Sequence, residues 1–228
     1  LGAPDKPIAF SVPTGNFGNV FAGWAAKQMG LPIEKLIVAS NRNDILTRFF
    51  ETGQMRRDDV APSLSPSMDI QVSSNFERLL FELLGRDSDM VRMLMNRFAE
   101  TGQFEVASDI HAKACEAFVG FRLDDVGTRA EIARTASETG MVIDPHSAVG
   151  LAAARDGREN GIVGDDVPIV SLACAHPAKF PDAVMSATGV SPALPPHMTG
   201  LMEREDRVSV IKNDIAEIQS FVQSEMRS

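Results

Sequence analysis

The stretch IAFSVPTGNFGN at residues 8–19 decides the fold. It opens with a short apolar run that has β-branched residues at both ends, a pattern typical of a buried parallel strand. Turn formers follow, and residues 20–29 then predict a helix that ends at Gly30. A second apolar run at residues 35–39 predicts another strand. Because such a crossover is nearly always right-handed, we expect the loop after the first strand at the carboxyl edge of a parallel sheet.

The remaining sequence predicts an α/β protein with a largely helical middle. In that middle, Ser88 is the expected N-cap of a helix, while residues 106–117 are ambiguous. Further along, the runs at 141–143 and 168–173 are strand candidates. We divide the chain into an α/β part with the glycine-rich loop, a mostly helical insert, a return to the α/β domain, and a C-terminal linker and helix. These four segments are residues 1–74, 75–139, 140–190 and 191–228.

Composition and charge limit the classes of function. Apolar residues make up 44% and charged residues 23%, as in a globular protein rather than a disordered one. The net charge of −9 and the lack of a basic stripe argue against a nucleic-acid partner. No apolar run reaches the roughly 18 residues of a membrane span, so no membrane partner is expected. The two cysteines are too few for a disulfide framework, which favours a cytoplasmic protein.

The start of the chain carries no targeting signal. It begins LGAPDK, with neither a basic segment nor an apolar segment of the secretory type. It also lacks an initiator methionine. We therefore expect this chain to be the downstream part of a longer protein.

The GNFGN loop is the strongest local indication of function. Gly15 and Gly18 permit backbone torsions and close approach that a side chain would block. The helix that follows has unpaired N–H groups and the positive end of its dipole at this point, which suits a phosphate dianion. The dinucleotide and P-loop fingerprints are both absent, and a loop without lysine suits a phosphate that is not transferred. A plain turn remains the alternative.

Several motifs, in order, resemble the threonine synthase family, whose members are pyridoxal 5′-phosphate (PLP) enzymes of fold type II. The resemblance extends over about residues 8–188. It rests on SVPTGNFGN, MGLPIEKLIVASNRND, SPSMDIQVSSNFERLLFELL, DPHSAVG and AHPAKFPDAV, which begin at residues 11, 29, 65, 144 and 175. It implies a three-layer αβα parallel sheet of the tryptophan synthase β-like class with a helical insert.

The resemblance also implies a reaction and a cofactor site. Family members convert O-phospho-L-homoserine and water into L-threonine and phosphate. Cys174 would lie beside the pyridine nitrogen of PLP, where members commonly have threonine. A thiol forms only weak hydrogen bonds, so that nitrogen would be poorly supported. The expected contacts of the cofactor phosphate are Gly15, Asn16, Phe17, Gly18 and Asn19.

The Schiff-base lysine of the family is not found in this chain. In the family it lies in a segment like LAFKD in the N-terminal half. Lys179 belongs to a late family motif rather than to the lysine segment. The resemblance therefore implies a C-terminal part with no catalytic residue of its own, inactive alone and completed by the missing N-terminal half. The chain's lysines are at positions 6, 27, 35, 113, 179 and 212, and none has the LAFKD context.

Other polar residues have two interpretations each. His146 fits either a cap or core hydrogen bond, or catalysis, and His176 fits either the cofactor edge or a loop-fixing role. Asp44, with Asn41 and Asn43, follows a strand end where ligands bind in α/β sheets, but helix capping is the simpler account. No histidine or cysteine spacing indicates a metal site. Arginines 42, 48 and 78 fit either a substrate phosphate or the solvated face of a helix.

Two alternatives to a threonine synthase remain. The first is a related fold type II enzyme such as a threonine dehydratase or cysteine synthase, against which the SSNFER motif and the long helical middle argue. The second is a non-catalytic α/β module that binds an anion or a partner, which the absent lysine would also fit.

Overall fold

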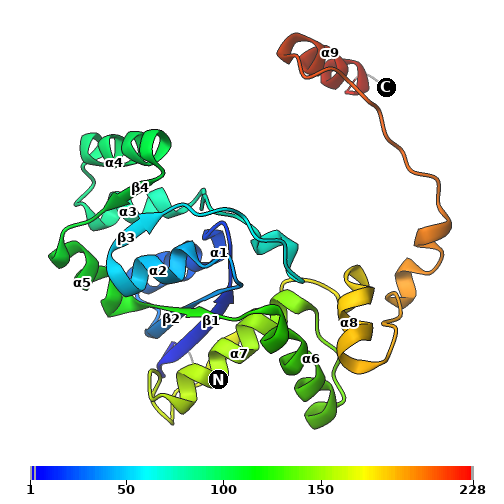
Figure 1. Cartoon of the computed structure of the whole chain (residues 1–228), viewed down its shortest axis with the longest axis horizontal. Coiled ribbons are helices and arrows are strands. Elements are labelled where there is room, and N and C mark those ends of the chain that lie inside the picture. Colours follow the sequence, from blue (N-terminus) through cyan, green and yellow to red (C-terminus); the bar gives the residue numbers. More distant parts are fainter. Residues whose placement is uncertain (1, 3, 227–228) are drawn as a thin grey trace. The chain divides into compact units, whose positions relative to one another are not determined.

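The computed structural model describes residue 2 and residues 4–226, and it separates into two compact units. The first unit is Leu1–Ala193 and the second is Leu194–Ser228. Figure 1 shows the elements of both units along the chain. The finer division into four segments stays a prediction.

A four-stranded parallel sheet forms the centre of the first unit. Its order is β5-β2-β1-β6, with β1 at Ile8–Pro13, β2 at Ile33–Ser40, β5 at Phe118–Arg122 and β6 at Ile169–Ser171. Helix α1, Gly18–Gln28, connects β1 to β2. The predicted strand–loop–helix–strand unit is therefore confirmed, and the GNFGN loop lies at the carboxyl end of β1.

Helices cover both faces of this sheet, because the strands are apolar on both faces. Alternate residues of β2 belong to different cores: Leu36 and Val38 face one cluster, while Ile37 and Ala39 face the other. The first cluster includes residues of α1, α2, α3 and α5, and the second includes residues of α7 (Figure 1). The three-layer αβα prediction is thus confirmed. The helices span Ile45–Thr52 (α2), Phe76–Leu83 (α3), Ser108–Ala117 (α5) and Pro145–Glu159 (α7).

An aromatic cluster anchors the GNFGN loop to the first core. The Phe17 side chain is fully buried, and its ring centroid lies 5.5 Å from that of Phe76 and 5.8 Å from that of Phe118. The backbone of Phe17 has φ 65°, a left-handed conformation that is uncommon for any residue other than glycine. The buried ring holds the loop in this conformation.

The remaining elements of the first unit lie around these layers. Helix α6 packs against α7 and α8, while the two short strands form a separate antiparallel pair. That pair was not predicted from the sequence. The elements are β3 at Gln54–Arg56, β4 at Gln103–Glu105, α4 at Ser88–Thr101, α6 at Asp125–Thr139 and α8 at Pro181–Thr188.

Two sequence predictions of local structure are wrong. Helix α4 is capped by Asp87, whose carboxylate accepts the N–H groups of Asp89 and Met90, so Ser88 is the first helical residue and not the cap. No strand forms at residues 141–143, and this short run without regular structure leads directly to Asp144, the N-cap of α7. The ambiguous residues 106–117 are mainly helical, as α5.

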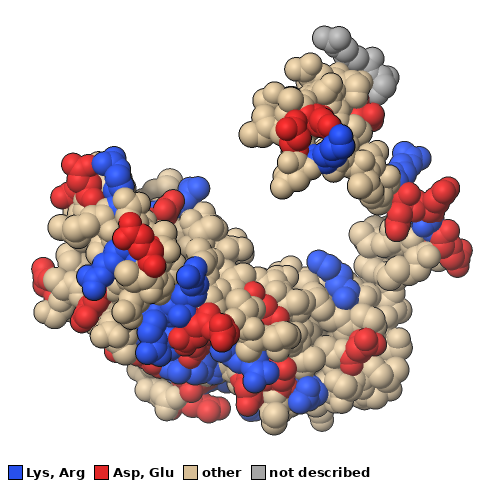
Figure 2. All heavy atoms as spheres, turned by 45° about the horizontal axis from the view of Figure 1, so that its top comes forward, with Lys and Arg blue, Asp and Glu red and all other residues tan. Residues whose placement is uncertain are grey.

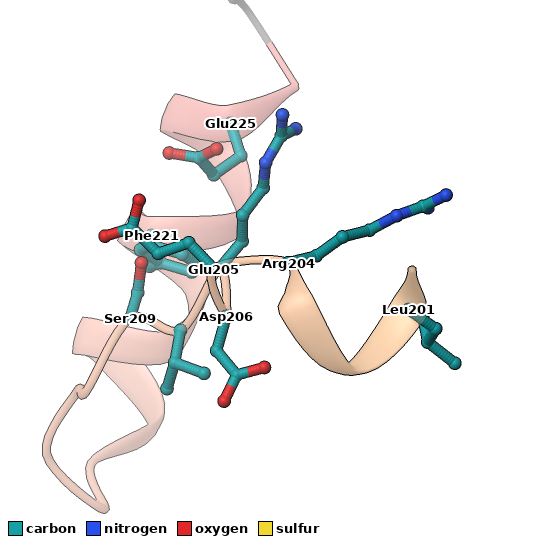
Figure 3. Close-up of a pocket in the computed structure, with 9 residues that line it drawn as sticks. Leu201, Arg204, Glu205, Asp206, Ser209, Phe221 and Glu225 are labelled. Carbon is teal, nitrogen blue, oxygen red and sulfur yellow. The ribbon is translucent and has the colours of Figure 1, made fainter. Parts of the chain in front are cut away.

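The second unit contains helix α9, Ile215–Glu225, and two single 3-10 turns, Pro196–Met198 and Leu201–Glu203. Asp214 caps α9 by accepting the N–H groups of Ala216 and Glu217. A hollow of about 1330 Å³ lies between residues 201–209 and α9 (Figure 3). All its lining residues except Phe221 are exposed, so it is an open surface rather than a built site.

The surface matches the acidic composition. On the face shown in Figure 2, basic and acidic side chains are interspersed, and no broad basic surface stands out. Within the part of the chain that the structure describes, no helix combines the length and apolar character needed to cross a membrane.

Candidate functional site

A cavity of about 260 Å³ lies beside the carboxyl end of β1. Four separate segments form it: the β1–α1 loop, the turn at Pro66–Met68, the start of α7 and the loop after β6. The structure brings five of the residues named from the sequence, Gly15, Asn16, Gly18, Asn19 and Cys174, together around it. The full lining is Pro13, Thr14, Gly15, Asn16, Gly18, Asn19, Ser67, Met68, His146 and Cys174.

The loop that lines this cavity carries unpaired backbone donors. Among the described residues, no acceptor pairs with the backbone N–H groups of Gly15, Asn16, Gly18 or Asn19. Gly18 and Asn19 begin α1, so the positive end of the helix dipole adds to these donors. Such a set of donors suits an anion with several oxygen atoms.

Phe17 does not belong to this set of donors. Its backbone N–H donates to Oγ1 of Thr14 at 3.0 Å, and its side chain is buried in the first core. Phe17 therefore shapes the loop rather than lining the cavity.

Residues 73–75 hold the loop from the outside. The backbone N–H and the side-chain amide of Asn75 both donate to the carbonyl oxygen of Asn16, at 3.0 and 2.9 Å. The Ser74 hydroxyl donates to Oδ1 of Asn16 at 3.3 Å. Both residues belong to the SSNFER motif, but nothing local in the sequence indicates that they contact Asn16. These contacts fix the carbonyl and the side chain of Asn16 beside the cavity.

The two loop glycines differ in the space around them. A Cβ added at Gly15 would lie 3.1 Å from Cδ1 of Ile70 and 3.2 Å from the Met68 backbone, so this position is tightly packed. A Cβ added at Gly18 would meet only the Asn75 side-chain nitrogen, at an ordinary 3.6 Å. Gly18 therefore accommodates a Cβ as it stands, whereas a Cβ at Gly15 requires Ile70 or Met68 to shift.

Asp144 lies at the centre of a hydrogen-bond network behind the cavity. It is fully buried, and Oδ1 accepts the backbone N–H and the ring Nδ1 of His146, both at 2.9 Å. The hydroxyl of Ser147 donates to the other carboxylate oxygen. Burial by itself would raise the pKa of Asp144, but the hydrogen bonds from His146 and Ser147 hold it below its ordinary value. Asp144 is therefore a carboxylate at neutral pH.

The network extends to two walls of the cavity. Nε2 of His146 accepts the backbone N–H of Ser67 at 3.3 Å, and Oγ of Ser147 accepts the backbone N–H of Cys174 at 3.2 Å. Burial, followed by the nearby charge of Asp144, raises the pKa of the Cys174 thiol. Cys174 is therefore a neutral thiol at neutral pH.

The other candidate residues lie outside the cavity. His176 accepts the Ala178 N–H at its Nδ1 and so fixes the turn at Pro177–Lys179, which favours its loop-fixing role. Asp44 occupies the N-cap position of α2, but its carboxylate binds Arg48 and Arg122 instead of the helix N–H groups.

Asn41 and Asn43 are buried in a network that holds the segment before Ser67. The Asn41 side-chain amide donates to Ser65 and to Asp69, and that of Asn43 also donates to Asp69. They therefore hold the residues that flank the turn at Pro66–Met68.

The lining of this cavity contains neither a lysine nor a cluster of metal-binding side chains. No lysine is among its lining residues, and Lys179 instead lies 5.8 Å from the ring centroid of Phe180. In residue 2 and residues 4–226, no three His, Cys, Asp or Glu side chains gather where they could hold a metal ion.

Comparison with known proteins gives one consistent result. The family model described as threonine synthase, C-terminal, matches residues 147–222. The chain is 48% identical to threonine synthase of Pseudomonas aeruginosa, over 97% of this chain and 47% of that protein. It is 40% identical to threonine synthase of Corynebacterium glutamicum, over 96% of this chain and 46% of that protein. The chain thus spans about half the length of the curated relatives it matches.

Solved structures agree with this result. The PLP-bound threonine synthase of Brucella melitensis matches with a TM-score of 0.90 and 46% identity, over 100% of this chain and 48% of that one. Yeast threonine synthase matches with a TM-score of 0.86 and 34% identity, over 99% of this chain and 48% of that one. The fold is therefore that of the fold type II class of PLP enzymes. Within that class, the chain belongs to the threonine synthase family and corresponds to the C-terminal part of its members.

Proposed function

We propose that this chain forms the cofactor-phosphate side of a PLP-dependent threonine synthase, a lyase that acts on a phosphate ester. The complete protein would convert O-phospho-L-homoserine and water into L-threonine and phosphate, in the cytoplasm. The observation that carries the proposal is the set of unpaired N–H groups at Gly15, Asn16, Gly18 and Asn19, four residues that line a cavity of about 260 Å³.

The residues around the cavity fit the cofactor. The unpaired N–H groups and the start of α1 suit a phosphate dianion. Cys174 is placed across the same cavity, where it could face the pyridine nitrogen as a neutral thiol. PLP, when bound, acts as an electron sink for the substrate carbons, and the protein orients it. This chain's part would be to bind the phosphate and hold the walls of the cavity.

The lysine that binds PLP would come from the N-terminal half of the complete protein. No lysine lines the cavity, so this chain by itself would be inactive. The missing half is accordingly the proposed partner of this chain.

The sharpest test replaces Gly18 rather than Gly15. The Cβ of Gly18→Asp would make an ordinary contact with the Asn75 side chain at the start of α1, where a negative charge favours the helix. Two negative charges about 4 Å apart repel by roughly 4 kcal/mol at an effective dielectric near 20. Half of that repulsion would weaken PLP binding about thirtyfold. The measurement is a titration of the apo form of the full-length protein with PLP, followed by visible absorbance.

Gly18→Asn is the matched control, because it has nearly the same size and no charge. It should bind PLP within about fivefold of wild type, since it keeps the backbone donors and adds no repulsion. Inorganic phosphate should also compete less effectively with PLP in Gly18→Asp than in wild type. If Gly18→Asp binds PLP as tightly as Gly18→Asn, the GNFGN loop is only a turn and the proposed site is wrong.

A further inference from the structure

One buried carboxylate connects two walls of the cavity that are far apart in the sequence. Through His146, Asp144 reaches the backbone of Ser67, and through Ser147 it reaches the backbone of Cys174. We propose that Asp144, His146 and Ser147 are positioning residues that set the width of the cofactor site. The proposal rests on the proposed function and identifies residues that act on PLP binding without donating to its phosphate.

The geometry defines the protonation of the histidine. Because the Ser67 N–H donates to Nε2, that nitrogen carries a lone pair, and the ring proton lies on Nδ1, facing Asp144. The carboxylate therefore selects the tautomer that can accept from Ser67. This is the arrangement by which an outer carboxylate orients a histidine in many functional sites.

The Ser67 wall is close to the phosphate loop. The backbone of Met68 would lie only 3.2 Å from a Cβ added at Gly15, so the turn at Pro66–Met68 packs directly against the loop. Release of Ser67 would let this turn move away from Gly15. His146 has no freedom to follow it, because it is buried, with its ring centroid 4.8 Å from that of Phe180.

The Cys174 wall is held in a similar way. Strand β6 ends at Ser171, and Cys174 follows in a segment with no regular structure. The backbone N–H of Cys174 donates to Oγ of Ser147, and its thiol makes only long contacts of 3.9 and 4.0 Å to Leu172 and Pro13. Ser147 therefore decides where Cys174 lies relative to the loop at Gly15.

Two matched pairs of variants test this role in the full-length apo protein. His146→Phe keeps a ring of similar size but has no lone pair, whereas His146→Gln keeps an acceptor for Ser67. Ser147→Ala loses the hydroxyl, whereas Ser147→Thr keeps it. We expect the Phe and Ala variants to bind PLP about tenfold more weakly, as for one lost hydrogen bond of about 1.4 kcal/mol. The Gln and Thr variants should remain within about threefold of wild type.

The same titration separates this proposal from the proposed function. If Gly18→Asp weakens PLP binding but each matched pair binds equally, the positioning role is wrong and the phosphate site stands. If Gly18→Asp has no effect, the proposed site fails, and the positioning role fails with it. Thermal unfolding of the apo variants completes the test. If the Phe and Ala variants melt at lower temperatures than their matched partners but bind PLP equally well, His146 and Ser147 stabilise only the fold.

Discussion

The hydroxyl oxygen of Thr14 accepts the backbone N–H of Phe17 at 3.0 Å, across the turn that follows β1. This contact gives a partner to the backbone N–H of the one residue of GNFGN that does not line the cavity. It also supports the left-handed backbone of Phe17, whose φ is 65°. The free N–H groups of Gly15, Asn16, Gly18 and Asn19 depend on this arrangement.

Thr14→Val should therefore destabilise the chain while keeping its shape. Thr14 is buried, and valine would leave the Phe17 N–H without a partner. An unpaired buried donor costs about 1–3 kcal/mol. Urea unfolding should show a lower midpoint for Thr14→Val and a nearly unchanged midpoint for Thr14→Ser, which keeps the hydroxyl. Equal midpoints for the two variants would show that the contact contributes nothing.

Close packing of α7 on the sheet yields a second prediction. A Cβ at Gly157 would lie 2.6 Å from Cδ1 of Ile37, a core residue of β2. We expect Gly157→Ala to lower the free energy of unfolding by about 1–2 kcal/mol, because overpacking outweighs the gain in helix propensity. Ile37→Val removes the clashing methyl, so the double variant should be more stable than the sum of the two single effects implies.

The control for this prediction is Gly164→Ala. Its added Cβ would lie 3.8 Å from the nearest atoms, those of Glu34 and Val167, which is ordinary contact. Urea unfolding should therefore show little change for this variant. If the effects of Gly157→Ala and Ile37→Val on the free energy of unfolding simply add in the double variant, the proposed clash between these two residues is wrong.

The strands of the sheet and the GNFGN loop could be predicted from the sequence, because each depends on a pattern of neighbouring residues. A continuous apolar run defines β2, and glycines at a strand–helix junction define the GNFGN loop. It was not sufficient for Phe17, since nothing local shows that its ring packs on Phe118, far along the chain. The contact between Asn75 and Asn16 likewise joins residues 59 apart.

The errors have similar causes. Asp87 and Ser88 are adjacent residues that both favour capping, and only the backbone geometry decides between them. The run at 141–143 is apolar enough for a strand, but a strand also needs a neighbour in the sheet. The Asp144 network was hidden for another reason. Its histidine and serine were visible in DPHSAVG, whereas their partners at Ser67 and Cys174 belong to other segments.

Asp144 should make stability depend on acidic pH. Its pKa is held below the ordinary value in the folded chain, so its ionised form stabilises the fold above the unfolded pKa of about 3.9. That contribution is lost as the pH falls through the folded pKa, because the unfolded chain then binds the proton more readily. Asp144→Asn should be about 1–2 kcal/mol less stable at neutral pH, because an amide has one acceptor oxygen where the carboxylate uses two, for His146 and for Ser147. Its stability should also fall less steeply below pH 4 in urea unfolding.

Asp165→Asn serves as the control for that pH profile. Asp165 is exposed, and its replacement removes the same formal charge without touching the Asp144 network. It should follow the wild-type profile. Parallel profiles for wild type and Asp144→Asn would mean that Asp144 does not couple folding to protonation.

The thiol of Cys174 gives a final prediction that needs neither cofactor nor activity. Burial raises the pKa of this thiol, and the charge of Asp144 raises it further. Because only the thiolate reacts, alkylation by iodoacetamide at pH 8 should be slower than that of a free cysteine. Asp144→Asn removes the charge, so the pH midpoint of alkylation should fall, with about a tenfold faster reaction for each unit that the pKa drops. Cys115→Ser as the common background leaves Cys174 as the thiol that reacts. An unchanged midpoint in Asp144→Asn, with Asp165→Asn as the charge-matched control, would show that the Asp144 carboxylate does not act on this wall of the cavity.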